Sequence, residues 1–303
     1  MKVWISGLLE PDSKANLSIY SSSINFGDSV FEMQRTYNRR TFKLQEHIDR
    51  LYASAKYVGI DIPYLPYELY EAHENLLIEN RHEFNEHDEI RSLIHVDRGI
   101  IPIYKSSGLD IGVKVIIACW PLKWIIPDAY KIYTEGVPAI IPGQRTIPAQ
   151  LLEPKVKMRS RLHLKMADME VKRSNPDAWA LLLDPDGYIA EGSGSNFFYI
   201  KSRELFTPEP RNCLRGISRK YIMELARKLK VEVFERNIEP YDILQADEAF
   251  FSNTPYGIVP IISINGQQVG KGIPGRLTKY LMHKWSEDIA CDFIGQTKGW
   301  NNA

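Results

Sequence analysis

The segment GYIAEGSGSNFFYI, residues 187–200, says most about how this chain folds. A turn glycine, a short apolar run, a glutamate, a glycine- and serine-rich loop and an aromatic run follow one another. Apolar and aromatic runs separated by such a loop predict two strands joined by a short connection. Glu191 ends the first strand beside flexible glycines. It is therefore either a solvated loop acid or an acid that points into a cleft.

Residues on both sides of that segment alternate between helical and strand patterns. Apolar residues three and four positions apart predict helices, and short β-branched or aromatic runs predict strands. The predicted helices are 47–60, 66–82, 162–174 and 218–230, and the predicted strands are 31–37, 41–44, 89–99, 112–120, 178–184, 196–200, 248–253 and 257–264. The pair Asn265-Gly266 predicts a hairpin turn. The chain is therefore predicted to be α/β, or α+β, in two parts.

The division between the two parts is predicted from a change in composition. Residues 121–150 contain five prolines and few periodic runs, which is typical of a connection between domains. We expect a small N-terminal α/β domain at 1–125, an interdomain linker at 126–140 and a larger C-terminal domain at 141–303.

Overall composition excludes several classes of protein. The 303 residues are 44% hydrophobic and 25% charged, as in a globular protein, and the 38 basic residues balance 38 acidic ones. Zero net charge argues against nucleic acid as a partner. Three widely spaced cysteines predict neither a disulfide framework nor a metal site. The apolar runs are too short for a signal peptide or a membrane span, so we expect no membrane partner and a cytoplasmic protein.

Three further fragments could bind an anion. Ile217 and Ser218 open a helix after Gly216, where free amides and a hydroxyl suit a phosphate. Asn253 and Thr254 leave a strand end, and Arg50 lies in a predicted helix. Each fragment also has a plainer interpretation, namely a capped helix, a turn and a local salt bridge.

The segment VKMRSRLHLK, residues 156–165, is crowded with cations. A run of cations is consistent with a solvated helix face or a phosphate-binding patch. It could also contain one lysine that does covalent chemistry. Composition does not distinguish these alternatives.

The order of several motifs resembles one known family. The segments are NFGDSVFE (25–32), FKLQEHIDRLYASA (42–55), GYIAEGSGSNFF (187–198), LFTP (205–208), LRGISR (214–219) and ADEAFFSNTPYGIVPI (246–261). Together they resemble the class IV aminotransferases, which bind pyridoxal 5'-phosphate in fold type IV. The resemblance runs from about residue 25 to 278. It implies a small α/β domain, a larger pseudo-barrel domain and a homodimer.

The resemblance also implies roles for individual residues. The family has a lysine that forms a Schiff base with the cofactor, and a glutamate that faces the pyridine nitrogen. Glu191 matches that glutamate. Counting back from it as in branched-chain members gives Lys157 as the catalytic lysine, with Lys155 and Lys165 as alternatives. The positions that match the family's phosphate site are Arg50, Ile217, Ser218 and Thr254, with Asn253 beside them.

Substrate choice is less constrained by the resemblance. Branched-chain members have an arginine that Arg91 matches, and Phe26 and Phe31 would form an apolar pocket wall. We expect the D-amino-acid carboxylate trap to be absent, because the matching positions are Phe31, Ile103 and Lys105. Arg98 is either a substrate contact or a strand-end salt-bridge partner.

We therefore expect an aminotransferase that moves an amino group from a hydrophobic or branched-chain amino acid to a 2-oxo acid by a ping-pong mechanism. A D-amino-acid or (R)-amine transaminase and an aminodeoxychorismate lyase-like enzyme remain alternatives. A homodimer that keeps the fold without turnover is the alternative from a different class.

Overall fold

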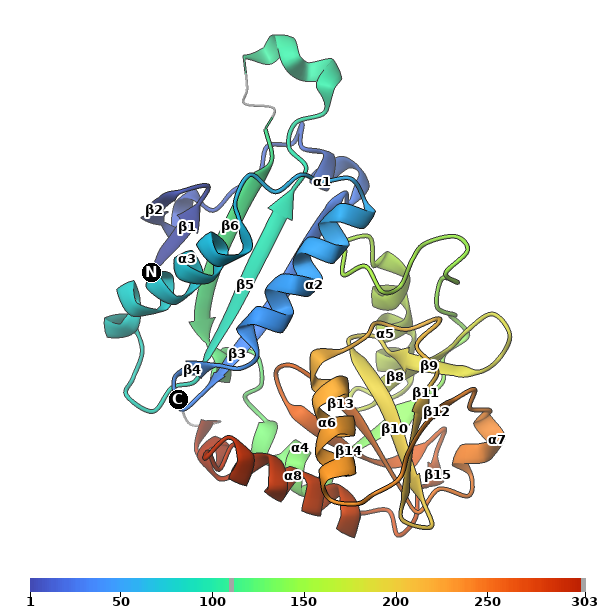
Figure 1. Cartoon of the computed structure of the whole chain (residues 1–303). Coiled ribbons are helices and arrows are strands. Elements are labelled where there is room, and N and C mark those ends of the chain that lie inside the picture. Colours follow the sequence, from blue (N-terminus) through green and yellow to red (C-terminus); the bar gives the residue numbers. More distant parts are fainter. Residues whose placement is uncertain (109–111, 301–303) are drawn as a thin grey trace. The chain divides into compact units, whose positions relative to one another are not determined.

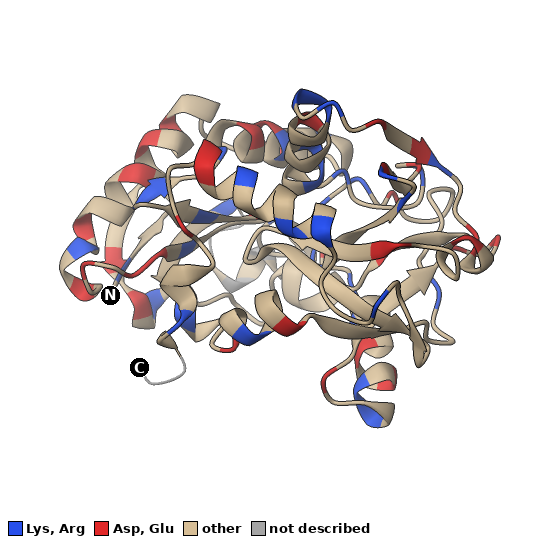
Figure 2. Cartoon of the chain, turned by 90° about the horizontal axis from the view of Figure 1, so that it is seen from below, with Lys and Arg blue, Asp and Glu red and all other residues tan. Residues whose placement is uncertain are grey.

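The computed structural model describes residues 1–108 and 112–300, which form two compact units (Figure 1). The first unit comprises Met1–Ile125 and Val156–Arg161, and the second comprises Ile126–Lys155 and Leu162–Ala303. Basic and acidic residues are interspersed along the ribbon (Figure 2), as the balanced composition predicts. Among the described residues, no helix is both long and apolar enough to cross a membrane.

The first unit is an antiparallel sheet with the strand order β2-β1-β6-β5-β3-β4. Its strands are β1 (Lys2–Ile5), β2 (Leu8–Pro11), β3 (Ser29–Tyr37), β4 (Arg40–Thr41), β5 (Ile90–Asp97) and β6 (Lys114–Pro121). Its helices are α1 (Ser22–Phe26), α2 (Leu44–Tyr57) and α3 (Pro66–Glu79). Helices α2 and α3 lie side by side against the sheet (Figure 1). Apolar residues of α2, such as Ile48 and Leu51, are fully buried there.

The two faces of the first sheet carry different side chains because residues alternate along each strand. Glu32 of β3 is hydrogen-bonded to His47 of α2, and Ser92 of β5 to His73 of α3. The helices therefore cover the face that carries Glu32 and Ser92. The opposite face carries Phe31 of β3 and its register partner His95 of β5.

A short segment from much later in the chain extends this sheet. The amide of Phe31 donates to the carbonyl of Lys157 at 3.0 Å, and the amide of Arg159 donates to the carbonyl of Ser29 at 3.0 Å. Between them, Val30 and Met158 form an antiparallel bridge. Antiparallel pairing directs the side chains of opposite residues to the same face. Lys157 and Arg159 are therefore directed to the face of Phe31.

The second unit is built around a closed barrel. The strands follow the order β10-β13-β14-β7-β8-β9, and β9 pairs again with β10. Strands β11 and β12 extend the sheet from β10, and β15 pairs with β14. The strands are β7 (Val137–Ile140), β8 (Trp179–Leu183), β9 (Ile189–Gly192), β10 (Ser195–Lys201), β11 (Glu204–Pro208), β12 (Val233–Arg236), β13 (Glu248–Asn253), β14 (Gly257–Ile264) and β15 (Gln267–Gln268). The expected pseudo-barrel is thus confirmed.

The helices of the second unit are α4 (Ala129–Glu135), α5 (Leu162–Ser174), α6 (Ile217–Lys228), α7 (Pro240–Ile243) and α8 (Arg276–Asp288). The barrel core is aromatic and aliphatic, with Phe197, Phe251 and Val259 fully buried. Asn265 and Gly266 join β14 to β15 with positive φ angles of 50° and 79°, which confirms the predicted hairpin turn.

Two segments differ from the sequence prediction. Residues 126–140, expected to be a linker, form α4 and β7, and β7 is a barrel strand between β14 and β8. The prolines are compatible because Pro138 stands at an irregular position of the pairing with β14. Residues 41–44, expected to be a strand, contain only the end of β4. Lys43 has a positive φ of 55°, and Leu44 begins α2.

Candidate functional site

The residues predicted to form the site divide between the two units. Phe26, Phe31, Arg50, Arg91 and Lys157 belong to the first. The second contains Glu191, Ile217, Ser218, Asn253 and Thr254.

Lys157 is held by its backbone beside β3. Its carbonyl accepts from Phe31, and its amide donates to the hydroxyl of Ser54, a buried residue of α2, at 3.2 Å. Its Nζ lies 4.9 Å from the centroid of the Phe31 ring. The lysine therefore has a fixed attachment and an amine directed to the Phe31 face of the sheet.

The two alternative lysines have other surroundings. Lys155 makes an ion pair with Glu153 at 2.5 Å, and its Nζ also donates to the carbonyl of Arg211 at 3.4 Å. Lys165 is exposed on α5, as expected for a surface lysine. The assignment of the catalytic role to Lys157 stays a prediction. The contacts of Lys155 give it an ordinary structural role, and Lys165 is a surface residue.

Arg50 belongs to a buried charge cluster. Its Nε donates to Glu32 Oε1 at 2.6 Å and its second terminal nitrogen to Oε2 at 2.9 Å. His47 Nδ1 lies 2.7 Å from the same Oε2. Burial alone would raise the pKa of Glu32, but Arg50 and His47 hold it well below its usual range. Burial lowers the pKa of His47, and Glu32 only partly offsets that effect. The cluster therefore fixes the orientation of the arginine that is predicted to bind phosphate.

Glu32 and His47 were not assigned a role from the sequence, although both lie in the motifs that carry the family resemblance. Glu32 is completely buried, and His47 is nearly so. Their signal is the spacing of His47 and Arg50 on one helix, which brings both side chains to one carboxylate. The sequence does not show that this carboxylate comes from a neighbouring strand.

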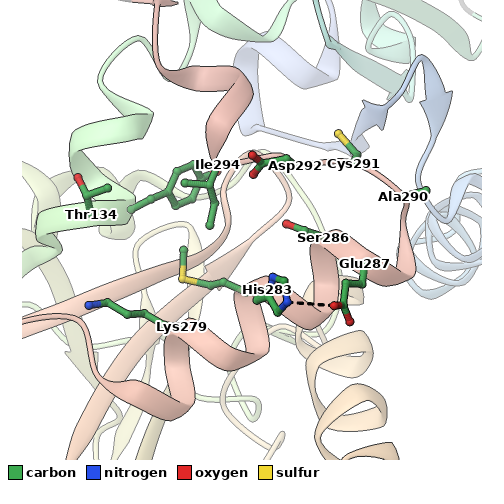
Figure 3. A pocket seen from close by; sticks show the side chains of 11 residues that line it. Thr134, Lys279, His283, Ser286, Glu287, Ala290, Cys291, Asp292 and Ile294 are labelled. Atoms are coloured by element: carbon green, nitrogen blue, oxygen red, sulfur yellow. Dashed lines mark ion pairs between the residues drawn. The ribbon is translucent and has the colours of Figure 1, made fainter.

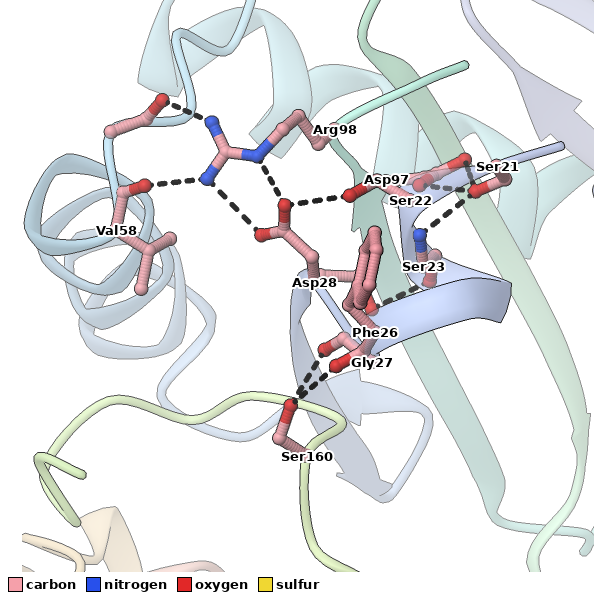
Figure 4. Close-up of polar contacts among 12 residues, drawn as sticks. Ser21, Ser22, Ser23, Phe26, Gly27, Asp28, Val58, Asp97, Arg98 and Ser160 are labelled. Carbon is pink, nitrogen blue, oxygen red and sulfur yellow. Dashed lines mark hydrogen bonds and ion pairs between the residues drawn. The ribbon is translucent and has the colours of Figure 1, made fainter. Parts of the chain in front are cut away.

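Phe31 and Phe26 differ in exposure. The ring of Phe31 is fully buried, and three cations lie over it. Phe26, at the end of α1, has a side chain that is 70% exposed. The hydroxyl of Ser160 donates to the carbonyls of Phe26 and Gly27 (Figure 4). A Cβ at Gly27 would lie 2.7 Å from that hydroxyl oxygen, so glycine permits the close approach.

Arg91 and Arg98 make different contacts. Arg91 stands opposite Arg35 in the pairing of β5 with β3, and one terminal nitrogen lies 2.8 Å from Met33 Sδ. Arg98 forms an ion pair with Asp28 and donates to the carbonyls of Val58 and Gly59 (Figure 4). The interpretation of Arg98 as a strand-end salt-bridge partner is therefore confirmed. A substrate role of Arg91 stays a prediction.

The positions of the D-amino-acid carboxylate trap are only partly described. Ile103 is 76% exposed in the 3-10 helix Pro102–Ser107. The side chain of Lys105 lies outside the described part of the structure.

In the second unit, Asn196 connects the predicted residues. Asn196 pairs with Glu191 across β9 and β10 and with Ser252 across β10 and β13. Its amide nitrogen donates to Glu191 Oε2 at 3.3 Å and to the carbonyl of Leu214 at 2.7 Å. The amide of Leu214 also donates to Glu191 Oε2, at 3.0 Å. Glu191 is thus an oriented carboxylate rather than a solvated loop acid.

The start of α6 lies next to Asn196. A Cβ at Gly216 would come 2.1 Å from Asn196 Oδ1, so the turn before the helix requires glycine. Within the described residues, no side chain caps this helix at Gly216, and Ser218 is buried in its first turn. Uncapped amides at a helix start favour an anion.

Asn253 and Thr254 lie in the turn between β13 and β14. Asn253 Oδ1 accepts a hydrogen bond from the amide of Tyr256 at 2.9 Å, so this oxygen orders the turn. Thr254 is partly buried in the same turn. The structure thus gives Asn253 a role in turn geometry, and its contact with a phosphate stays a prediction, as does that of Thr254.

The chemistry of these groups fits pyridoxal phosphate. Within the first unit, Lys157 has the amine that a cofactor aldehyde requires, and Arg50 is a cation suited to a phosphate. Within the second unit, Glu191 is an oriented acid suited to a protonated pyridine nitrogen, and the start of α6 has uncapped amides and the Ser218 hydroxyl, which suit a phosphate.

A separate pocket lies along α8 in the second unit (Figure 3). Its lining residues include Lys279, His283, Glu287 and Asp292. His283 and Glu287 form an ion pair one helical turn apart at 3.0 Å. None of the predicted site residues lines this pocket.

Comparison with known proteins identifies the family of the chain. The family model for amino-transferase class IV matches residues 29–264. A putative branched-chain-amino-acid aminotransferase of Methanocaldococcus jannaschii is 33% identical over 290 residues, covering 95% of this chain and 96% of that protein. A D-alanine aminotransferase of Bacillus licheniformis is 30% identical, covering 92% and 94%.

Solved structures show the same fold. The branched-chain aminotransferase of Thermoproteus uzoniensis, solved with norvaline, has a TM-score of 0.83 and 28% sequence identity, covering 97% of this chain and 96% of that one. The family model and the relatives span most of the chain. The chain therefore belongs to the class IV aminotransferases of fold type IV, and it is a pyridoxal-phosphate-dependent transferase.

Proposed function

We propose that this enzyme transfers an amino group from a branched-chain or other hydrophobic L-amino acid to a 2-oxo acid in two half-reactions. Branched-chain aminotransferases among the relatives support this substrate class. In the structure, the observation that carries the proposal is the setting of Lys157. It is attached to β3 by a backbone hydrogen bond and directs its amine to an aromatic ring.

When bound, pyridoxal phosphate supplies the electron sink that stabilises negative charge at the substrate Cα. The proposed role of Lys157 is to attach the cofactor and then to move a proton at that carbon as a general base and acid. Glu191 holds a proton on the pyridine nitrogen, and Asn196 and the Leu214 amide orient its carboxylate.

The proposed phosphate contacts are Arg50, the Ile217 and Ser218 amides, the Ser218 hydroxyl and Thr254. Glu32 orients Arg50 through two hydrogen bonds, so the arginine does not need to be ordered when the phosphate arrives. Phe26 and Phe31 are proposed as apolar walls for the substrate side chain, and Arg91 as a polar contact.

The experiment is to follow the visible absorption of the purified holoenzyme as amino donors are added one at a time. Loss of the cofactor band with L-leucine, and its return with a 2-oxo acid, is the expected result. A band that responds only to D-alanine or to (R)-1-phenylethylamine would contradict the proposed substrate class. The D-alanine aminotransferase among the relatives makes this the alternative to test.

The same experiment distinguishes a lyase. Without an amino acceptor, an aminotransferase forms at most one equivalent of product per active site, because it stops after the first half-reaction, whereas a lyase continues to turn over. Formation of many equivalents of product from a donor in the complete absence of a 2-oxo acid would therefore refute the transaminase assignment.

We also propose that the enzyme works as a cytoplasmic homodimer, as the family resemblance implies, with functional domains that follow the division near residue 125. Light scattering during size-exclusion chromatography tests the dimer, and a mass of about one 34.9 kDa chain at micromolar concentration would contradict it. Limited proteolysis near residue 125 tests the division.

A further inference from the structure

We propose that Arg159 and His95, with added positive charge from Arg161, bind a carboxylate of the substrate beside Lys157. The inference rests on the proposed function and deepens it, because it assigns the residues that recognise a substrate anion. It also gives the cation-rich segment 156–165 a specific role.

The geometry begins with one aromatic ring. Arg159 Cζ lies 4.0 Å from the centroid of Phe31, and Arg161 Cζ lies 4.7 Å from it. Lys157 Nζ lies 4.9 Å from the same centroid. The guanidinium of Arg159 and the reactive amine are therefore no farther apart than the sum of two such distances. A carboxylate of an amino-acid substrate whose Cα lies beside that amine fits within this range.

His95 adds a donor at the same place. It is the register partner of Phe31, so the two side chains stand next to each other on one face of the sheet. Its side chain is 8% exposed, and neither ring nitrogen has a hydrogen-bond partner among residues 1–108 and 112–300. Buried polar groups are almost always hydrogen-bonded, so this imidazole is a suitable hydrogen-bond donor for a ligand.

Besides burial, the charge of Arg159 lowers the pKa of this imidazole. Within the described residues, Arg159 has the Phe31 ring as its partner and no carboxylate. Asp97 lies two residues from His95 on the same face of β5, but its oxygens accept hydrogen bonds from Ser21. Burial, followed by repulsion from Arg161, lowers the pKa of Arg159 to about 10. Burial and the charge of Arg159 lower the pKa of His95 to about 4.

Packing on Phe31 alone does not account for this arrangement. A cation over a ring interacts through the ring face, which leaves the N–H groups of the guanidinium without acceptors. Two arginines that repel each other in a partly buried place favour an anion between or beside them. A carboxylate accepts two parallel hydrogen bonds from one guanidinium, one on each oxygen, and each oxygen keeps a further lone pair that can accept a hydrogen bond from His95.

Two carboxylates fit this chemistry. One is the α-carboxylate that every amino-acid substrate has. The other is the distal carboxylate of a dicarboxylic partner such as glutamate and its 2-oxo acid. The two sources predict different effects of the same substitution.

The first test measures carboxylate binding to the cofactor-free protein. Isothermal titration with 4-methylpentanoate, which has one carboxylate, and with glutarate, which has two, is compared between the wild type and Arg159→Met. Loss of the guanidinium is expected to weaken binding by about tenfold to a hundredfold. Weaker binding of both acids would assign the α-carboxylate, and weaker binding of glutarate alone would assign the distal one. Unchanged binding of both acids, or no binding to the wild type, would overturn the inference.

Further variants separate recognition from damage to the fold. Arg159→Lys keeps the charge and is expected to recover part of the affinity, whereas His95→Phe is expected to weaken binding with little loss of packing. Arg227→Met removes an exposed arginine of α6 and is the matched control, expected to bind as the wild type does. As an independent readout, NMR of the imidazole should show the pKa of His95 rising when glutarate is added, because the bound charge opposes that of Arg159.

The holoenzyme distinguishes this inference from the proposed function. The half-reactions with L-leucine and L-glutamate are followed by the loss of the cofactor band. If both proceed normally in Arg159→Met, the proposed function stands and the inference is refuted. If no amino acid reacts with the wild type while Arg159 still governs carboxylate binding, the proposed function fails and the anion site stands.

Discussion

The buried cluster of Glu32, His47 and Arg50 makes a strong prediction for stability. Glu32→Gln keeps the size of the side chain and one acceptor oxygen but removes its charge. Arg50 then remains mostly buried without its counter-ion. Removing one partner of a buried ion pair typically costs about 3–5 kcal/mol. Because the Arg50 side chain is 14% exposed, we expect a cost near the lower end, about 3 kcal/mol.

The assay is urea unfolding of the cofactor-free protein at pH 7, with circular dichroism and fluorescence as independent probes. The double variant Glu32→Gln with Arg50→Met removes both charges. We expect it to be more stable than Glu32→Gln alone, because the mostly buried cation is removed together with the carboxylate that balances it. A single variant within about 0.5 kcal/mol of the wild type would refute the reasoning, because surface substitutions have effects of that size.

The cluster also predicts how stability depends on pH. The pKa of Glu32 is depressed in the folded protein, so its contribution is present above its unfolded value of 4.5 and is lost as the pH falls below it. The pKa of His47 is depressed too, so the unfolded chain binds a proton below pH 6.5 that the folded chain does not. Both groups therefore make the free energy of unfolding fall as the pH is lowered from 7 to 4. In Glu32→Gln the free energy of unfolding should fall less steeply below pH 4.5. An unchanged pH dependence in that range would show that Glu32 does not cause the loss of stability.

Three further predictions concern the cofactor. Lys157→Ala should abolish a borohydride-reducible link between the protein and pyridoxal phosphate, and Lys155→Ala should keep it; mass spectrometry after reduction shows which lysine is labelled. Asn196→Ala should weaken cofactor binding by about tenfold, because Glu191 loses a hydrogen bond and the turn before α6 loses another; equal affinity in a fluorescence titration would exclude this positioning role. Gly216→Ala should weaken cofactor binding and lower the melting temperature, because the new Cβ would clash with the Asn196 side chain. Calorimetry measures the melting temperatures of the apo and holo forms, and unchanged values would show that the turn accommodates alanine.

The cation-rich segment shows why spacing alone could not assign its residues. Lys157, Arg159 and Arg161 alternate along the chain, which is compatible with one face of a strand, whereas a helix would place them on different faces. Their common partner, Phe31, comes from β3 of the first unit. Only the pairing of Met158 with Val30 brings them together. The position of His95 beside Phe31 follows from strand register, and its burial follows from packing, so the sequence alone did not predict either.

Local patterns along the sequence determined much of this protein. Helical periodicity placed α5 and α6, the Asn-Gly pair placed the hairpin turn, and the order of the motifs placed the chain in its family. These features depend on residues close together in the chain, where side-chain spacing and backbone preference act directly.

The tertiary structure decided what depends on residues far apart. It placed the expected linker 126–140 in a helix and a barrel strand, showed Arg98 bound to Asp28, and left Phe26 exposed at the end of α1. It also joined Glu32 to the helix that carries Arg50. Strand pairing and burial arise from hydrogen bonds and packing between distant segments. A one-residue change in register would direct every side chain to the other face, which the sequence pattern alone does not exclude.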